Sequence, residues 1–269
     1  MAWHSSGNSN ESLVENLWRN KLITQQCVKD AFLKVDRKYY TKTRPYEDSP
    51  QQISTHATIS APHMHANAVE SLLPLLLPKT GDRQPAEGAP EAIGKPGRPR
   101  RVLDIGSGSG YLTHVLARLV GDDGVVVGLE HTTFLRDLGE DNMRNDPNGK
   151  ELLDSGRVRF RCGDGRLGWS EQAHEGKPGV GGPADAAAPT QDEAGGWDAI
   201  HVGAAAIELH EALVRQLRSP GRMFIPVSDG GASGNQYIWV VDKDENGNIE
   251  KKKLYGVRYV PLTDAHPNP

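Results

Sequence analysis

The feature that most limits how this chain can fold is a glycine-rich run, VLDIGSGSGYL, between Val102 and Leu112. An apolar segment leads into Gly106, Gly108 and Gly110, and a helical spacing of apolar residues begins at Leu112. Glycines at such a junction let the backbone turn sharply and approach a ligand with no side chain in between. The run therefore predicts a strand, a ligand-binding loop and a helix in direct succession.

Strand and helix patterns continue to alternate after this loop. Short β-rich runs are separated by segments whose apolar residues recur at intervals of three and four. The predicted strands are 101–105, 125–129, 158–162, 197–202 and 222–227. Such alternation is typical of a parallel sheet with helices on both faces. Two further runs, 236–241 and 253–260, flank an Asn246-Gly247 turn signal, which favours an antiparallel pair at the end of the sheet.

We expect a single domain over 1–269, with a helical, substrate-binding N-terminal segment over 1–78 and a cofactor-binding core over 101–269. The expected class is α/β, as a Rossmann-like, doubly wound and mostly parallel sheet of seven strands. Two segments rich in Gly, Pro and Ala interrupt the chain at 79–100 and 173–196. Because neither carries enough apolar surface to offset the entropy of ordering it, we expect both to be disordered.

The charge balance limits the kinds of partner. The chain has 31 basic and 35 acidic residues, a formal net charge of -4, whereas holding nucleic acid or an anionic membrane by bulk charge requires a positive surface. The longest apolar stretch, Leu72 to Leu77, contains Pro74 and is far shorter than the roughly 20 residues that span a bilayer. We expect a cytoplasmic (cytosolic) monomer that binds neither nucleic acid nor membrane.

Neither disulfides nor a metal site are expected. Cys27 and Cys162 are too few and too far apart for a disulfide framework, and no Cys/His ligand spacing accompanies them. His63 and His65 could bind a metal, but no third ligand is identifiable. The N-terminal residues are polar and show no apolar run of a secretory signal.

Two nucleotide-bearing cofactors compete for the glycine loop. The dinucleotide fingerprint Gly-x-Gly-x-x-Gly would need a glycine where Tyr111 stands, so the strict pattern fails. The observed Gly-x-Gly-x-Gly, preceded by Asp104, resembles the first motif of class I S-adenosylmethionine-dependent methyltransferases. That resemblance implies that Asp104 helps to organise the ammonium end of the cofactor. A cofactor-free relative of the fold is the third alternative.

Acidic residues at the ends of the next two strands extend this resemblance. Glu130 ends the second strand, where a carboxylate can accept hydrogen bonds from both ribose hydroxyls, which suits either cofactor. Asp164 and Gly165 follow the third strand and match the family's next element, which implies a contact with adenine. Taken singly, Glu130 could be a solvated strand end and Asp164 a turn residue. Their order along successive strands favours a cofactor-binding edge.

Four longer segments resemble the protein-L-isoaspartate (D-aspartate) O-methyltransferase family. They are DSPQQISTHATISAPHMHA (48–66), HVGAAA (201–206), IPV (225–227) and YVPLTD (259–264), and the likeness covers nearly the whole chain apart from the two interruptions. The resemblance implies metal-free methyl transfer from S-adenosyl-L-methionine, leaving S-adenosyl-L-homocysteine, to the α-carboxylate of L-isoaspartyl and D-aspartyl residues in damaged proteins and peptides. The ester would then proceed through a succinimide back toward aspartate.

The same resemblance implies the site residues. Ser60 would be the catalytic residue, a neutral donor that holds the acceptor carboxylate; its plain structural alternative is a cap for the helix that begins near Pro62. An isoaspartyl α-carboxylate is already ionised at pH 7 and needs no general base, so catalysis should consist of aligning oxygen, methyl and sulfur. Cofactor contacts are implied for Ala57, Thr58, Ile59, Ser60, His65, Asp104, Gly106, Ser107, Gly108, Glu130, Asp164, Gly165 and Thr263.

Two other functions remain open from the sequence. One is a non-catalytic binding module that keeps the cofactor fold as a recognition platform. The other is an O-methyltransferase for a small carboxylic acid, which would keep the mechanism and change the acceptor.

Overall fold

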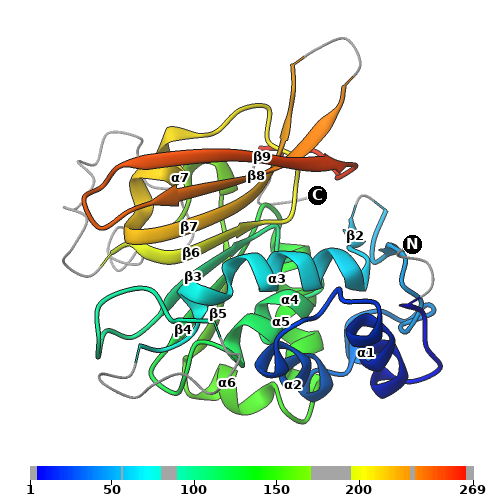
Figure 1. Cartoon of the computed structure of the whole chain (residues 1–269). Coiled ribbons are helices and arrows are strands. Elements are labelled where there is room, and N and C mark those ends of the chain that lie inside the picture. Colours follow the sequence, from blue (N-terminus) through cyan, green and yellow to red (C-terminus); the bar gives the residue numbers. More distant parts are fainter. Residues whose placement is uncertain (1–4, 56, 80–89, 171–194, 231–233, 265–269) are drawn as a thin grey trace.

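A twisted sheet forms the centre of the molecule, which is shown as a computed structural model in Figure 1. The structure describes residues 5–55, 57–79, 90–170, 195–230 and 234–264. Its seven strands are β3 (Arg101–Ile105), β4 (Val125–Glu130), β5 (Val158–Cys162), β6 (Trp197–Val202), β7 (Leu217–Ser228), β8 (Gln236–Lys243) and β9 (Ile249–Val257). They lie in the order β5-β4-β3-β6-β7-β8-β9. The first five strands in this order, β5, β4, β3, β6 and β7, are parallel to one another. Strands β8 and β9 are added antiparallel. The expected fold class is confirmed.

Four strands differ from the prediction at their ends, β4 and β8 by one and two residues and β7 and β9 by more. β7 begins at Leu217 rather than at residue 222, and β9 spans 249–257 rather than 253–260. The predicted turn between β8 and β9 is present, with Gly247 at a φ of +85° that glycine adopts without strain. Tertiary pairing therefore extends β7 through a segment that the apolar pattern alone does not mark.

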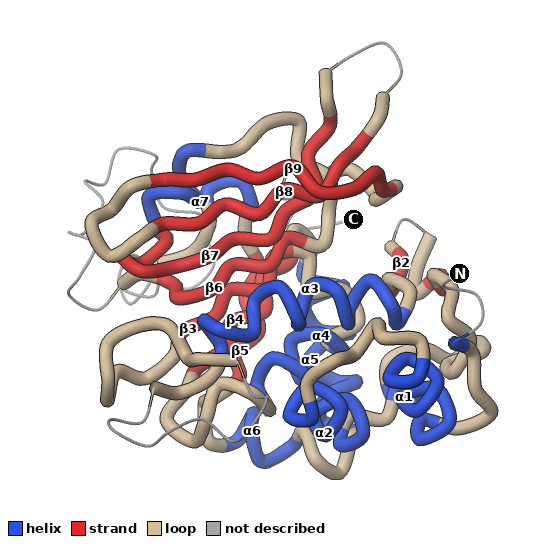
Figure 2. Tube along the Cα trace, viewed as in Figure 1, coloured by secondary structure: helices blue, strands red, loops and turns tan. Residues whose placement is uncertain are grey.

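Helices cover both faces of the sheet (Figure 2). They are α1 (Asn10–Arg19), α2 (Gln26–Lys34), α3 (Pro62–Leu76), α4 (Tyr111–Ala117), α5 (Thr133–Asn145), α6 (Lys150–Asp154) and α7 (Glu211–Gln216), with short 3-10 turns η2 (Arg37–Tyr39) and η3 (Gly165–Leu167). Successive strand residues face opposite sides. Val102 and Val126 belong to a core beneath α1 to α6, whereas Leu103 and Val127 belong to a second core that includes Leu213 of α7.

The first predicted disordered segment, 79–100, is fixed at its end. Residues 80–89 lie outside the described residues, but Arg98 and Arg100 bind the buried Asp198, with Arg98 Nη2 2.7 Å from Asp198 Oδ1. A buried carboxylate thus supplies partners at this end of the segment that its low apolar content does not predict. The second segment, 173–196, lies outside the described residues except at Gly195 and Gly196.

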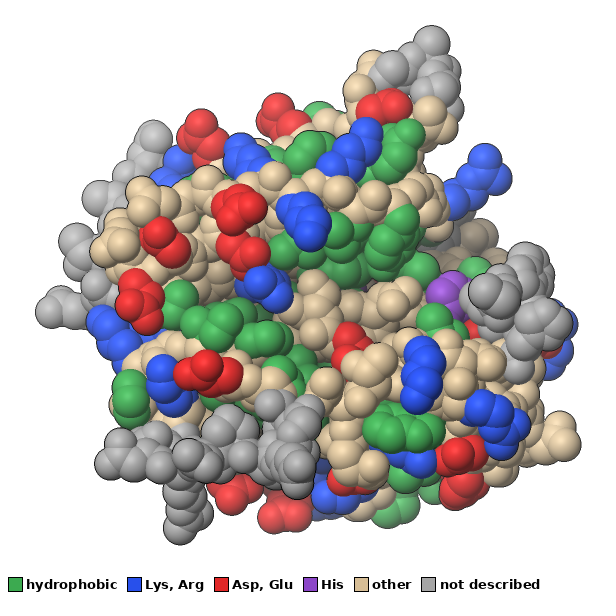
Figure 3. Space-filling model, in the orientation of Figure 1, with side chains coloured by type: hydrophobic (Ala, Val, Ile, Leu, Met, Phe, Trp, Pro, Cys, Tyr) green, Lys and Arg blue, Asp and Glu red, His purple; other side chains and the backbone are tan. Residues whose placement is uncertain are grey.

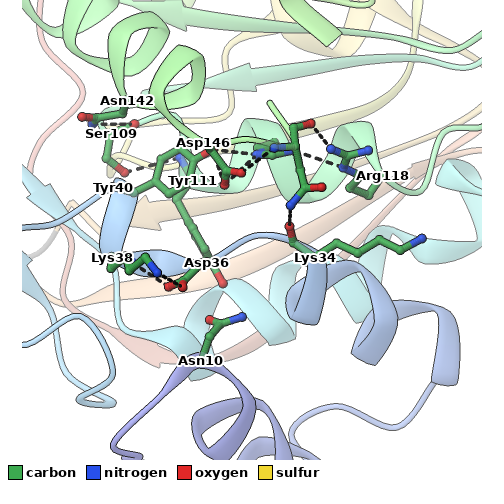
Figure 4. A network of polar contacts seen from close by, with 12 residues as sticks. Asn10, Lys34, Asp36, Lys38, Tyr40, Ser109, Tyr111, Arg118, Asn142 and Asp146 are labelled. Carbon is green, nitrogen blue, oxygen red and sulfur yellow. Dashed lines mark hydrogen bonds and ion pairs between the residues drawn. The ribbon is translucent and has the colours of Figure 1, made fainter. Parts of the chain in front are cut away.

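A buried polar network joins the N-terminal segment to the core (Figure 4). The Tyr40 hydroxyl lies 2.6 Å from His114 Nδ1 and 3.4 Å from Asp146 Oδ2, and Arg118 Nε donates to His114 Nε2 at 3.1 Å. Because Nε2 accepts, the neutral ring carries its proton on Nδ1. Burial lowers the pKa of His114 to about 3, so the ring is neutral in the folded protein at pH 7.

This network predicts loss of stability in mild acid. The unfolded chain binds a proton at His114 near pH 6.5, whereas the folded state does not, so the free energy of unfolding should fall as pH drops below that value. His65 acts in the same direction, because its burial also lowers its pKa. Between pH 7 and 5.5 we expect each histidine to cost about 1 kcal/mol. Urea unfolding across this range measures the slope.

The matched variant for this prediction is His114→Gln. It should be less stable than the parent at pH 7.5, yet its stability should depend less steeply on pH. An equally steep dependence in this variant would assign the acid sensitivity to other groups.

Candidate active site

The strand order reverses between β3 and β6, and this switch point sets the place of the site. In open α/β sheets ligands bind at the carboxyl ends of the strands at such a point. The loop after β3 carries Gly106 and Gly108 at φ of +72° and +53°, where side-chain-bearing residues are strained. The loop after β6 meets it, because the Gly203 N–H donates to the Ile105 carbonyl at 2.7 Å.

The polar groups at this edge suit a nucleoside cofactor. Glu130, at the end of β4, accepts the Gly108 N–H through Oε1 at 2.7 Å and His131 through Oε2 at 3.0 Å. Its carboxylate is therefore held against the glycine loop. Ser107 Oγ is buried and has no hydrogen-bond partner among the described residues. An unsatisfied hydroxyl on this loop is what a site built for a polar ligand shows.

Asp104 lies behind the glycine loop. Its Oδ1 accepts from His201 Nδ1 at 2.7 Å, its Oδ2 accepts from the Thr113 hydroxyl at 2.6 Å, and the residue is 1% exposed. The carboxylate thus joins β3, β6 and α4. In this geometry both carboxylate oxygens of Asp104 are bound by protein groups, and the cofactor contact that the resemblance implies for it stays a prediction.

The loop after β5 is linked to the C-terminal segment. Asp164 accepts from the Arg166 main-chain N–H at 2.9 Å and pairs with its guanidinium, which also contacts Asp264. Thr263 stands next to this bridge and is exposed. Gly165 is packed so closely that an added Cβ would lie 2.3 Å from Ile105 Cγ2. Close packing thus explains this glycine without any ligand.

The hairpin of β1 (Gln51–Gln52) and β2 (Thr58–Ile59) brings the N-terminal site residues to the same edge. The Ile53 N–H donates to the Ala57 carbonyl at 2.9 Å. A Cβ added to Gly108 would lie 3.5 Å from Ile53 Cδ1, so the hairpin packs over the glycine loop. The predicted residues 57–60 and the loop at 106–108 therefore come together from segments far apart in the chain.

A cavity of about 670 Å³ opens beside the glycine loop and contains Ser60. It meets the sheet edge at Gly203, and Tyr259, which also lines it, lies close to the Ser60 side chain. Ser60 does not cap α3, since the N-cap residue is Ala61. The lining residues are Pro50, Thr58, Ser60, Ala61, His63, Met64, Asn67, Gly203, Tyr255, Gly256, Val257, Arg258, Tyr259 and Val260.

The two histidines of the SAPHMHA segment have separate protein partners. His63 Nδ1 lies 2.8 Å from Asp48 Oδ1, and His65 Nδ1 lies 3.4 Å from Arg37 Nη1. Burial, together with Arg37, holds the pKa of His65 well below its usual value, so this ring is neutral. Because a guanidinium can only donate, the proton of His65 resides on Nε2. Among the residues that the structure describes, no three His, Cys, Asp or Glu side chains are grouped as metal ligands.

Three residues of this site have no counterpart among the predicted ones. Asp48 and Tyr259 lie within the segments that carry the family resemblance and Arg37 precedes the first of them, but nothing in the spacing of the three marks them. A buried arginine and a buried aspartate become recognisable only when the fold shows which polar groups they reach.

The chain matches known proteins over nearly its whole length. The family model described as protein-L-isoaspartate(D-aspartate) O-methyltransferase (PCMT) matches residues 8–81, 96–178 and 183–267. A protein-L-isoaspartate O-methyltransferase of Caenorhabditis elegans is 40% identical over 98% of this chain and 96% of its own length. Protein-L-isoaspartate O-methyltransferase 1 of Arabidopsis thaliana is 38% identical over 96% of this chain and 93% of its own.

One solved structure agrees closely in both fold and sequence. It is the crystal structure of a putative protein-L-isoaspartate O-methyltransferase from Plasmodium falciparum in complex with S-adenosyl-L-homocysteine. The TM-score is 0.72 and the identity 32%, over 96% of this chain and 99% of that one. The resemblance found in the sequence is confirmed by these relatives.

Proposed function

The chain belongs to the protein-L-isoaspartate(D-aspartate) O-methyltransferase family, and from this premise we propose how its site methylates damaged proteins. It is an S-adenosyl-L-methionine-dependent enzyme that methylates the free α-carboxylate of L-isoaspartyl and D-aspartyl residues. The single observation that carries the assignment is the Ser60 hydroxyl in a cavity that reaches Gly203, which packs against Gly106 of the glycine loop. The ester that forms closes to a succinimide, which opens back toward aspartate and so repairs the backbone.

The residues at the sheet edge would hold the cofactor. Glu130 would accept hydrogen bonds from ribose, while Ser107 Oγ would gain the partner that it lacks among the described residues. The remaining cofactor contacts would come from Ala57 to Ser60, His65, Gly106, Gly108, Asp164, Gly165 and Thr263, with Asp104 behind the loop. When bound, S-adenosylmethionine supplies an electrophilic methyl group on a sulfonium. No metal takes part in this chemistry.

The chain's own contribution to catalysis is to orient the carboxylate. The acceptor is ionised at neutral pH, so no residue has to remove a proton. Ser60 donates to one oxygen, which leaves the other free to align with the methyl group. Burial raises the pKa of Tyr259, so its hydroxyl remains a neutral donor beside Ser60. Two neutral hydroxyls hold the anion without the strong charge of an ammonium, which would weaken the nucleophile.

The turn after β6, which meets the cavity at Gly203, would help to keep water from the reacting atoms. Ala204, Ala205 and Ala206 are 7%, 3% and 0% exposed and present only methyl groups. A dry and rigid turn of this kind strengthens the hydrogen bonds around it. It also lacks a base, as methylation of an ionised acceptor allows.

The shape of the cavity favours a peptide over a small acid. Its volume of about 670 Å³ exceeds what a lone carboxylic acid needs. Its wall is formed by the end of the exposed edge strand β9 and the residues that follow it, from Tyr255 to Val260. Peptide on both sides of the acceptor residue could extend along that wall. A binding module without catalysis is disfavoured, because Ser60, which donates to the carboxylate of the methyl acceptor, and the residues of the cofactor edge are all present.

The enzyme is proposed to act as a cytosolic monomer built from a single domain over 1–269. Cys27 and Cys162 are free thiols, as a reducing compartment allows. No helix in the described part of the chain has the length and apolar character needed to cross a membrane. On the face shown in Figure 3, basic and acidic side chains are interspersed, which supports partners other than nucleic acid.

The decisive test compares two peptides that differ only at one linkage. Methyl transfer from S-adenosylmethionine is expected to the peptide with an L-isoaspartyl residue and not to its normal aspartyl counterpart, because only the former presents a free α-carboxylate within the chain. Labelled methyl incorporation measures both. Equal labelling of the two peptides would reject the assignment, and preferential labelling of a small carboxylic acid in competition would favour that acceptor instead.

A further inference from the structure

A buried arginine lies directly behind Ser60. Arg37, in η2, is 0% exposed and donates from Nη2 to the Ser60 carbonyl at 2.7 Å. Its Nη1 approaches His65, and its guanidinium lies 5.1 Å from the centre of the Tyr111 ring. One side chain therefore contacts the Ser60 segment, α3 and α4, and fixes these three parts relative to one another.

The charge of Arg37 is not balanced by a direct ion pair. Burial lowers its pKa to about 10, so the guanidinium remains charged at neutral pH. Among the described residues, no carboxylate forms a salt bridge with it. Asp48 acts on it electrostatically, but Asp48 Oδ1 accepts instead from the His63 main-chain N–H at 2.9 Å and from the His63 ring. A buried charge without a paired partner is costly, and a functional site is where such a cost is retained.

The position of this charge matches the chemistry of the acceptor. Ser60 lines the cavity, and Arg37, which is not among the lining residues, donates to the Ser60 carbonyl. Because Arg37 is fully buried, it attracts an anion in the cavity without contacting it. The carboxylate then receives hydrogen bonds from neutral hydroxyls alone, and it is still favoured over a neutral group.

Resting on the proposed function, we propose that Arg37 is the positioning residue of the acceptor subsite. Its hydrogen bond holds the Ser60 segment in place, and its positive charge draws the α-carboxylate of the isoaspartyl residue to the Ser60 hydroxyl. The charge should contribute to selection of a carboxylate over a carboxamide of the same shape by about tenfold.

The test measures that selection directly. Calorimetry in the presence of S-adenosylhomocysteine gives the affinity for an isoaspartyl peptide and for the same peptide with an α-carboxamide. Arg37→Met should reduce the carboxylate preference about tenfold, because it removes the charge. Arg37→Lys keeps the charge and should preserve the preference within about twofold, yet lower kcat because the ammonium cannot reproduce the guanidinium hydrogen bonds.

Arg100→Met is the matched control. Arg100 is also a buried arginine, but it lies in the Asp198 cluster away from the cavity lining. This variant should be less stable and should keep the carboxylate preference. Circular dichroism and S-adenosylhomocysteine binding show which variants are folded.

The outcomes separate this proposal from the function on which it rests. An unchanged preference in folded Arg37→Met overturns the role of the charge. If that variant does not fold, loss of the preference in Arg37→Lys, or a kcat equal to that of the parent, overturns the proposal. A parent enzyme that binds isoaspartyl and aspartyl peptides equally well counts against the function itself, whatever the variants do.

Discussion

Replacing Ser60 by alanine is expected to lower kcat about a hundredfold, the usual order for removing one preorganised donor from a reacting group. The Ser60 hydroxyl lies in the cavity beside the glycine loop and contacts Tyr259. Without it the carboxylate can rotate, so that its oxygen, the methyl group and the sulfur are aligned only part of the time. Steady-state kinetics with an isoaspartyl peptide gives kcat and KM for this variant.

The affinity for S-adenosylhomocysteine separates the acceptor role from a cofactor role. Ser60→Ala should change that affinity far less than kcat, whereas Asp164→Ala, at the cofactor edge, should weaken it. Ser71→Ala is the control, because Ser71 lies further along α3 and outside the cavity lining. A Ser60 variant that loses cofactor affinity and keeps its turnover number would reverse the two assignments.

The parts of the site that could be predicted are those where the backbone itself imposes the residue type. Gly106 and Gly108 have positive φ, so their spacing in the sequence reports the geometry of the loop. The positions of Glu130 and Asp164 could also be predicted from the backbone, because parallel strands place their carboxyl ends at one edge of the sheet. Gly165 shows the limit of this reasoning, because its packing against Ile105 alone explains its small size.

Side-chain contacts between distant segments could not be predicted. Ser60 and Tyr259 meet only because β9 leads the chain back to the cavity, and Arg37 reaches Ser60 only because η2 packs under α3 and α4. Neither pair has a spacing that a pattern could detect. The hydrogen bonds that Asp104 accepts from His201 and Thr113 could not be predicted for a similar reason, because these partners come from other elements.

The contacts of Arg98 and Arg100 at the end of segment 79–100 could not be predicted from composition. Composition measures how much apolar surface a segment can bury, and this segment has little. It does not measure what a single buried carboxylate can bind. Asp198 is 0% exposed, and Arg98 and Arg100 are held by it just before β3 begins.

Replacing Asp198 by alanine should therefore destabilise the fold by about 3–5 kcal/mol, the cost of breaking a buried ion pair from one side. Its Oδ2 accepts from the Arg101 main-chain N–H at 2.8 Å and from Arg218 Nη1 at 2.7 Å, while Oδ1 accepts from Arg98 at 2.7 Å. Removal would leave three arginine side chains close together without their shared anion. Urea unfolding at pH 7.5 measures the loss.

Activity should separate from stability in this variant. Asp198 lies near the amino ends of β3 and β6, whereas the cofactor edge and the cavity lie at the carboxyl ends of these strands. Folded Asp198→Ala should therefore keep the parent's kcat and KM below its unfolding transition. Arg98→Met, which removes one partially exposed partner, should cost less stability than Asp198→Ala. A fall in kcat without a fall in stability would contradict this expectation. It would mean that the Asp198 cluster affects the site through β3 and β6 and does more than stabilise their amino ends.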